Sequence, residues 1–107
     1  MPHYLIQVAY TPEAWAAMSK NPQDRAALIR PAVEALGGRV ESFYFSFGDY
    51  DVTAIAQFPT NVDAGAFAIS ATAGGGVRAY KTTPLFDAEE SMEAMRRSAM
   101  TGYAPPG

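Results

Sequence analysis

The sequence predicts an α+β protein in which strands and helices follow the order βαββαβ, with one extra helix at the C-terminal end. Four segments are rich in the aromatic and β-branched residues that favour strands, and helical spacing of apolar residues lies between them. The two central strands are joined through Gly48-Asp49, residue types that accept the backbone angles of a tight hairpin turn. The four expected strands are residues 3–10, 39–47, 50–58 and 77–86.

The first strand leads into a helical region with two start signals. Both alternating sets of side chains in residues 3–10 are largely apolar, so we expect both faces of this strand to be covered. Thr11 followed by Pro12 is typical of a helix N-terminus, and the segment Asn21-Pro22-Gln23-Asp24 repeats the signal of a cap followed by proline. These signals predict two consecutive helical segments before the second strand.

The second helical segment is expected to pack on the sheet through one apolar side. Residues at spacings of three and four form this stripe: Ala26, Ile29, Val33 and Leu36. Arg25 and Arg30 fall off the stripe and are expected to face solvent. Pro31 removes a backbone donor inside the segment, which predicts a kink or a division into two short helices. Gly37-Gly38 supplies the C-terminus.

The second half of the core repeats the pattern of helix and strand. A helix is expected from Val62 to about Thr72, capped by Thr60 or Asn61, and its many small residues allow close packing on a sheet. Residues 77–86 form the fourth strand. Pro84 near its end predicts an edge strand or a bulge, since proline cannot donate to a neighbouring strand.

The C-terminal residues predict a short helix and an extended tail. Asp87 and Glu90 have the spacing of a capping box, and the helix expected from Glu89 to Met100 is amphipathic. We expect one domain over residues 1–100 and an extended tail over residues 101–107.

The order β-α-β-β-α-β predicts the ferredoxin-like arrangement, with both helices on one face of a four-stranded antiparallel sheet. The opposite face then needs a cover, because both side-chain sets of the two central strands contain apolar or aromatic residues. We assigned Phe43, Phe45 and Phe47 to one side of the second strand, with Val40 and Tyr44 on the other. Two such sheets packed around a two-fold axis would bury this surface, so we expect a homodimer or a higher oligomer.

Composition excludes several classes of function. The chain has 107 residues, a formal net charge of −3 and scattered basic residues, which disfavours nucleic acid as a partner. Without cysteine there is no thiolate chemistry, and the lone histidine, His3, has no neighbour at metal-ligand spacing. No apolar run approaches the length needed to span a membrane. We therefore expect a cytoplasmic protein with no metal, no cofactor and no membrane partner.

The hairpin segment Phe47-Gly48-Asp49-Tyr50-Asp51 and the strand that continues from it resemble the GYD-domain family. The likeness covers nearly the whole chain, including Tyr4-Leu5-Ile6, Gly37-Gly38 and the C-terminal Gly102-Tyr103. The resemblance implies a place in the dimeric α/β-barrel superfamily. That superfamily also holds cofactor-independent monooxygenases, small isomerases, haem-binding dismutases and regulatory ligand-binding modules. The resemblance to the GYD-domain family supplies no catalytic residues to carry over to this chain.

The candidate functional residues lie near the hairpin and on the strands. For catalysis the candidates are Asp51, Tyr50, Tyr44 and Arg78, as acid, base or positioning groups. For ligand binding they are Tyr4, Asp51, Thr53 and Arg78. An ion pair between Arg78 and Asp51 is plausible, and an acidic ligand would compete for that arginine. The structural alternative is that Asp51 bonds backbone amides and fixes the turn.

Three functions remain open from the sequence. The first is a small homo-oligomeric protein that binds a small apolar or aromatic molecule. The second is a cofactor-independent monooxygenase or isomerase. The third is a structural module for assembly, in which the C-terminal tail lies on a neighbouring subunit.

Overall fold

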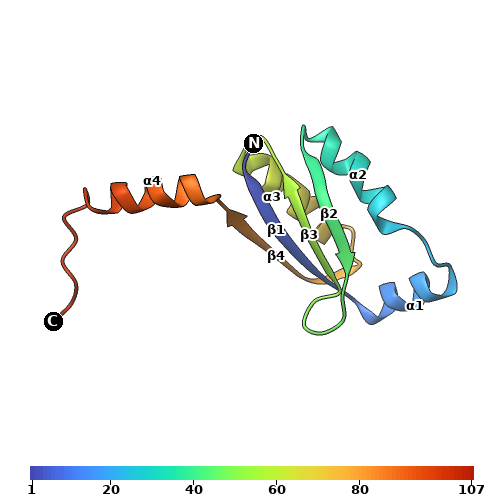
Figure 1. Cartoon of the computed structure of the whole chain (residues 1–107). Helices are drawn as coiled ribbons and strands as arrows, with labels where there is room; N and C mark the ends of the chain where they lie inside the picture. The colour runs from blue at the N-terminus through green and yellow to red at the C-terminus, as the bar shows by residue number, and fades with distance from the viewer.

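The structure, a computed structural model, covers residues 1–107 and has the predicted order of elements (Figure 1). The helical region between the first two strands consists of two helices, and a final helix follows the last strand. The elements in chain order are β1 (His3–Tyr10), α1 (Pro12–Lys20), α2 (Arg25–Ala35), β2 (Arg39–Phe45), β3 (Val52–Gln57), α3 (Asn61–Ala73), β4 (Val77–Leu85) and α4 (Ala88–Ser98).

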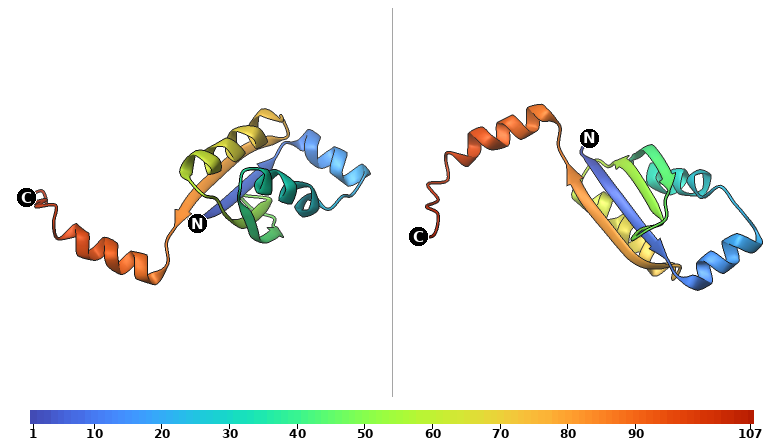
Figure 2. Two further views of the ribbon diagram at one scale, coloured as in Figure 1. Left: turned by 90° about the horizontal axis from the view of Figure 1, so that it is seen from above. Right: turned by 60° about the horizontal axis from the view of Figure 1, so that its bottom comes forward.

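The four strands form one antiparallel sheet in the order β2-β3-β1-β4. This is the ferredoxin-like order predicted from the sequence. Helices α2 and α3 lie on one face of the sheet, and the other face, here called the outer face, carries no helix (Figure 2). Pro84 lies on the edge strand β4, where its missing N–H group costs no ladder bond.

The core lies between the sheet and helices α2 and α3. Every second residue of β1 points into it, and α2 contributes the fully buried Val33. Aromatic rings extend this packing: the Phe58 ring lies 5.8 Å from the ring of Tyr4 and 6.0 Å from that of Phe67 on α3. Large apolar side chains buried in this way each contribute about 1.5–3 kcal/mol, so these contacts hold the helices to the sheet.

The turn between β2 and β3 is longer than predicted. The expected two-residue turn at Gly48-Asp49 is wrong, because residues 46–51 form a six-residue connection between the strands. Gly48 has a positive φ of 147°, whereas Asp49 does not. The connection is closed by Ser46, whose N–H group donates to the Asp51 carbonyl at 2.7 Å and whose hydroxyl donates to the Tyr50 carbonyl at 2.8 Å.

A bulge in β2 changes the assignment of faces made from the sequence. Val40 pairs with Ala56 and Ser42 with Ile55, so Glu41 is an extra residue in the strand. The bulge places Phe43 on the same face as Val40, and Phe43 packs against the core rather than on the opposite side of the strand. The outer face consequently mixes apolar and polar side chains. They include Leu5, Gln7, Thr53, Ile55, Gln57 and Thr83.

Helix α2 differs in two respects from the expectation. It begins at Arg25 with Asp24 as its N-cap, and the Asp24 carboxylate accepts from the Ala27 N–H group at 3.2 Å. Asn21 instead caps the C-terminal end of α1. Pro31 lies inside α2 without dividing it into two helices.

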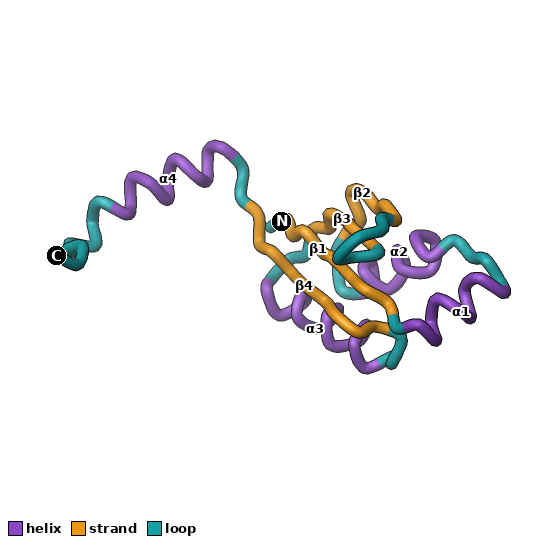
Figure 3. The backbone as a smooth tube through the Cα atoms, turned by 90° about the horizontal axis from the view of Figure 1, so that it is seen from below, coloured by secondary structure: helices purple, strands orange, loops and turns teal.

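Helix α4 extends away from the sheet together with residues 99–107 (Figures 1 and 3). The predicted capping box is confirmed: Asp87 and Glu90 exchange hydrogen bonds between side chain and backbone. The helix buries none of its residues. None of the helices has the length and apolar character needed to cross a lipid bilayer.

A candidate binding cavity between the helices and the sheet

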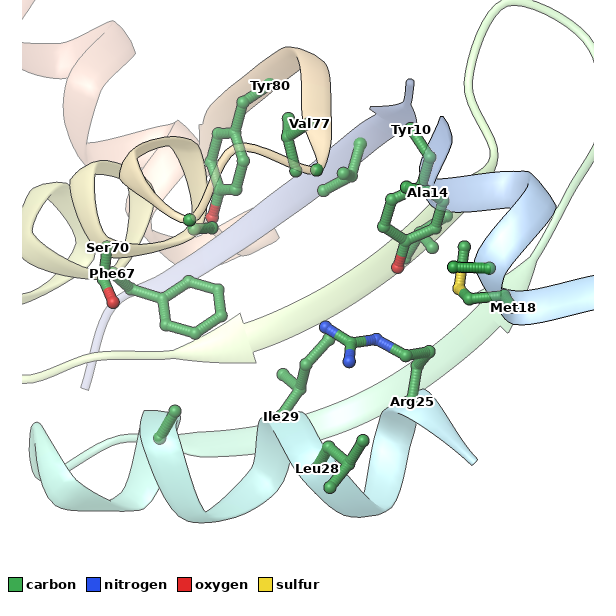
Figure 4. A pocket seen from close by; sticks show the side chains of 17 residues that line it. Tyr10, Ala14, Met18, Arg25, Leu28, Ile29, Phe67, Ser70, Val77 and Tyr80 are labelled. Carbon is green, nitrogen blue, oxygen red and sulfur yellow. The ribbon is translucent and has the colours of Figure 1, made fainter. Parts of the chain in front are cut away.

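A cavity of about 400 Å³ lies between the sheet and helices α1, α2 and α3, and it is open to solvent. Its walls come from all these elements (Figure 4). Val8 and Val52 line it from the sheet, Met18 from α1, Ile29 from α2 and Phe67 from α3. This volume falls in the range of pockets that hold small ligands, and the walls are mainly apolar as such pockets are.

Small residues explain why this space is left unfilled. Protein interiors are usually packed as densely as organic crystals, so a space of this size needs a cause. Helices α1, α2 and α3 present short side chains toward it, and these cannot reach across the gap. Six lining residues are alanine or glycine: Ala14, Ala17, Ala32, Ala71, Gly74 and Gly76.

Arg25 is the only charged residue that lines the cavity. Its side chain reaches from the first turn of α2 into the space between the helices (Figure 4). The expectation that Arg25 faces solvent is therefore wrong, whereas Arg30 is exposed as expected. The Nε atom of Arg25 is buried without a hydrogen-bond partner, and no carboxylate pairs with the guanidinium group. One amino group donates to Gln23 at 3.4 Å, a long bond.

Tyr80 contributes a second unpartnered polar group. Its hydroxyl group is buried and has no well-formed hydrogen bond, although the Thr82 hydroxyl is near. Burial raises the pKa of Tyr80 far above its ordinary value, and the neighbouring Thr82 offsets this only in part. The phenol therefore stays protonated at neutral pH and remains a hydrogen-bond donor.

A bulge in β4 brings two residues of that strand to the cavity wall. Tyr80 pairs with Val8, Ala79 with Ala9 and Val77 with Tyr10, so Arg78 is an extra residue in the strand. A regular strand would turn either Val77 or Tyr80 to the outer face, because side chains alternate. With the bulge, both line the cavity, while Arg78 is exposed.

A smaller, wholly apolar space of about 30 Å³ adjoins the cavity. The two spaces share lining residues, among them Ile29 and Phe67. Arg25 lines only the larger space, and Val33, two turns further along α2, lines only the smaller one. The site is therefore charged at one end of α2 and purely apolar further along the helix.

Asp51 lies outside the cavity and holds helix α1 to the end of β1. Its Oδ2 atom accepts from the Tyr10 N–H group at 2.9 Å and from the Trp15 indole N–H group at 3.1 Å. It forms no ion pair with Arg78, and β1 runs between β4, which carries Arg78, and β3, which begins just after Asp51. The Asp51 side chain thus accepts from a backbone amide, as the structural alternative expected, but this amide belongs to β1 and not to the hairpin turn.

The other residues predicted from the sequence do not line the cavity either. Tyr4 is buried in the core, and its hydroxyl donates to Asn61 at 2.5 Å. Thr53 and Tyr44 pair with each other on the outer face, and Tyr50 lies in the connection between β2 and β3. The structure does not bring the four catalytic candidates together into one site. Their roles in catalysis or ligand binding stay predictions from the sequence.

A polar cluster on the outer face joins β1, β2 and β3. The Glu41 carboxylate lies 3.0 Å from Nδ1 of His3 and accepts from the Gln57 amide at 2.6 Å. Partial burial alone would raise the pKa of Glu41. The hydrogen bond from Gln57, the contact with His3 and the charges of His3 and Arg39 outweigh it and lower the pKa below 4.5. We interpret this cluster as support for the β2 bulge.

The fold and the cavity define a small α+β protein with an apolar pocket on the helical side of its sheet. A comparison with protein families matches residues 4–95 to the GYD domain. The chain belongs to the GYD domain family. A comparison with curated proteins finds no match.

Proposed function

We propose that this protein binds a small apolar or aromatic molecule in the cavity between helices α1, α2 and α3 and the sheet. The observation that carries the proposal is the combination of an apolar space of about 400 Å³ with two buried polar groups that lack partners. Buried polar atoms in native proteins nearly always have a hydrogen-bond partner. The side chains of Arg25 and Tyr80, which carry these atoms, both line the cavity and supply polar groups to its otherwise mainly apolar wall.

A pocket-filling variant tests this proposal. The probes are two uncharged molecules, 2-naphthamide and 1-decanol, and calorimetry or thermal shift measures their binding to the full chain. Ala71→Trp places a large ring in the cavity from α3, so we expect it to abolish binding. Ala73→Trp on the same helix lies outside the cavity and should bind as the parent does. Binding that survives Ala71→Trp unchanged would place the ligand elsewhere and contradict the proposal.

Helix α4 supports self-association as a second function. Met92 and Met95 are three residues apart on one face of this helix, and both are exposed. Glu93 forms ion pairs with Arg96 and Arg97, so the helix has its own local support. An amphipathic helix with an unburied apolar face can pack on a second copy of the chain. The enzymatic alternative stays a prediction from the sequence.

A further inference from the structure

We infer that the molecule bound in the cavity carries a carboxylate group, which the Arg25 guanidinium holds at the α1 end of the site. This inference rests on the proposed function and names the chemical class of the ligand. The ligand would have an acidic head near Arg25 and an apolar body directed along α2 toward Ile29 and Phe67.

The first argument is the missing counterion. A buried or partly buried guanidinium group is stabilised when a carboxylate or a similar oxyanion pairs with it. Every other contact of Arg25 in the chain is weak or apolar: the bond to Gln23 is 3.4 Å long, and the cavity wall around it is apolar. The nearest acidic residue in sequence, Asp24, bonds the backbone of α2 and makes no ion pair with Arg25.

The second argument is the position of Arg25 on its helix. The N-terminal end of a helix carries a partial positive charge, so acidic residues are favoured there and basic ones are not. Arg25 is the first residue of α2, and the first turn of this helix contains no acidic residue. The Asp24 carboxylate caps the backbone of this end but does not pair with the Arg25 guanidinium, so an anion bound in the cavity would still pair with Arg25.

The third argument is the gradient of polarity along α2. Arg25, Ile29 and Val33 are each four residues apart, which corresponds to steps of about 6 Å along the helix. The first two line the larger space, and the last two line the smaller, wholly apolar one. A ligand with a charged group at one end and an apolar body about two helical turns long matches this order of residues.

Each probe pair shares its apolar body and differs in a charged or neutral head group: 2-naphthoate against 2-naphthamide, and decanoate against 1-decanol. The full-length protein should bind the acid of at least one pair about 10- to 100-fold more tightly than its neutral partner, the range expected for charge-assisted hydrogen bonds. Arg25→Gln should remove this preference, because it weakens binding of the acid far more than binding of the neutral probe. Arg78→Gln, which neutralises an exposed arginine outside the cavity, should retain it. Arg25→Lys keeps the charge but lacks the planar fork, so it should retain only part of the preference.

Thermal unfolding without ligand gives an independent readout. Arg25→Met should unfold at a higher temperature than the parent, because it removes a partly buried cation without a partner. Acid and neutral probes of equal affinity, or an acid preference that survives in Arg25→Gln, would overturn the inference while leaving the proposed function intact. If neither member of either pair binds, the proposed function fails, and this inference fails with it.

Discussion

Asp51 and Trp15 are joined by a hydrogen bond of 3.1 Å from the indole N–H group to the Oδ2 atom of the carboxylate. The same oxygen accepts from the backbone of Tyr10, and the Tyr10 and Trp15 rings meet edge to face at 5.6 Å. One carboxylate thus connects the end of β1, helix α1 and the residue before β3. Because α1 forms one wall of the cavity, Asp51 supports the candidate site from outside it.

We predict that Asp51→Ala destabilises the protein by about 1–3 kcal/mol, because it leaves a backbone donor and an indole donor without their acceptor. Trp15 is the only tryptophan in the chain, so its fluorescence during urea unfolding reports on this contact. Asp51→Asn keeps one carbonyl oxygen as an acceptor and should lose less stability than Asp51→Ala. A parent-like unfolding curve for Asp51→Ala would show that the carboxylate is not needed to hold α1.

We predict opposite effects of alanine at two glycines. A Cβ atom on Gly38 would collide with the Gln57 carbonyl oxygen and come within 3.0 Å of both Phe58 and Val33, so Gly38→Ala should cost about 1–3 kcal/mol or more. Gly65 lies inside α3, and no atom lies within 4 Å of a Cβ built there. Gly65→Ala should therefore stabilise the folded protein by about 0.5–1 kcal/mol. Chemical denaturation of both variants measures this difference. Equal effects of the two changes would contradict the close packing of Gly38 against Gln57, Phe58 and Val33.

We predict that Glu41 contributes to the loss of stability in acid. Its pKa in the folded protein lies below the ordinary 4.5, so the folded state binds the proton less readily than the unfolded state does. The stabilising contribution is complete above about pH 4.5 and is lost as the pH falls through the lowered pKa of the folded state. The unfolding temperature of Glu41→Gln should therefore fall less steeply than that of the parent as the pH is lowered into the acid range. Glu34→Gln, which changes an exposed carboxylate without a side-chain partner, is the control and should follow the parent. A curve for Glu41→Gln identical to that of the parent would exclude this contribution.

We predict that the apolar face of α4 promotes self-association. The double change Met92→Gln and Met95→Gln preserves length and charge but removes two apolar side chains, each worth about 1.5–3 kcal/mol when buried. Sedimentation velocity over a range of concentrations should show a smaller mass than for the parent. The control, Glu89→Gln, changes an exposed residue of α4 that takes no part in its ion pairs or its capping box, so its mass should not fall. A parent that is already monomeric at high concentration would exclude assembly through α4.

The succession of strands and helices could be predicted from the sequence because local signals agree with the fold. Thr11-Pro12 at the start of α1, the capping box at Asp87 and the family resemblance through the hairpin residues all hold in the structure. The local details of two strands were less accessible. The bulges at Glu41 and Arg78 are set by pairing between strands, and no residue pattern within either strand marks them.

The cavity could not be predicted because it depends on what several elements leave unfilled. Arg25 falls off the apolar stripe of α2, and periodicity alone then places it in solvent. Helix α1 and the glycines after α3 enclose that side of α2, and the long stem of arginine packs along apolar walls. A basic residue at the first position of a helix is the one sequence signal that could have singled out Arg25, because helix N-termini disfavour cations. The buried hydroxyl group of Tyr80 is likewise visible only in three dimensions.

The extra residue at Arg78 also bears on how this chain tolerates changes in length. Removing Arg78 would place Val77 and Ala79 next to each other along β4, opposite Tyr10 and Ala9, and would restore ordinary alternation. Val77 and Tyr80 would keep their orientation toward the cavity. Deleting Arg78 should therefore leave the lining of the pocket unchanged. Deleting Lys81 would instead turn the side chains on one side of the deletion to the opposite face of the sheet. Natural length variation among relatives should collect at this position.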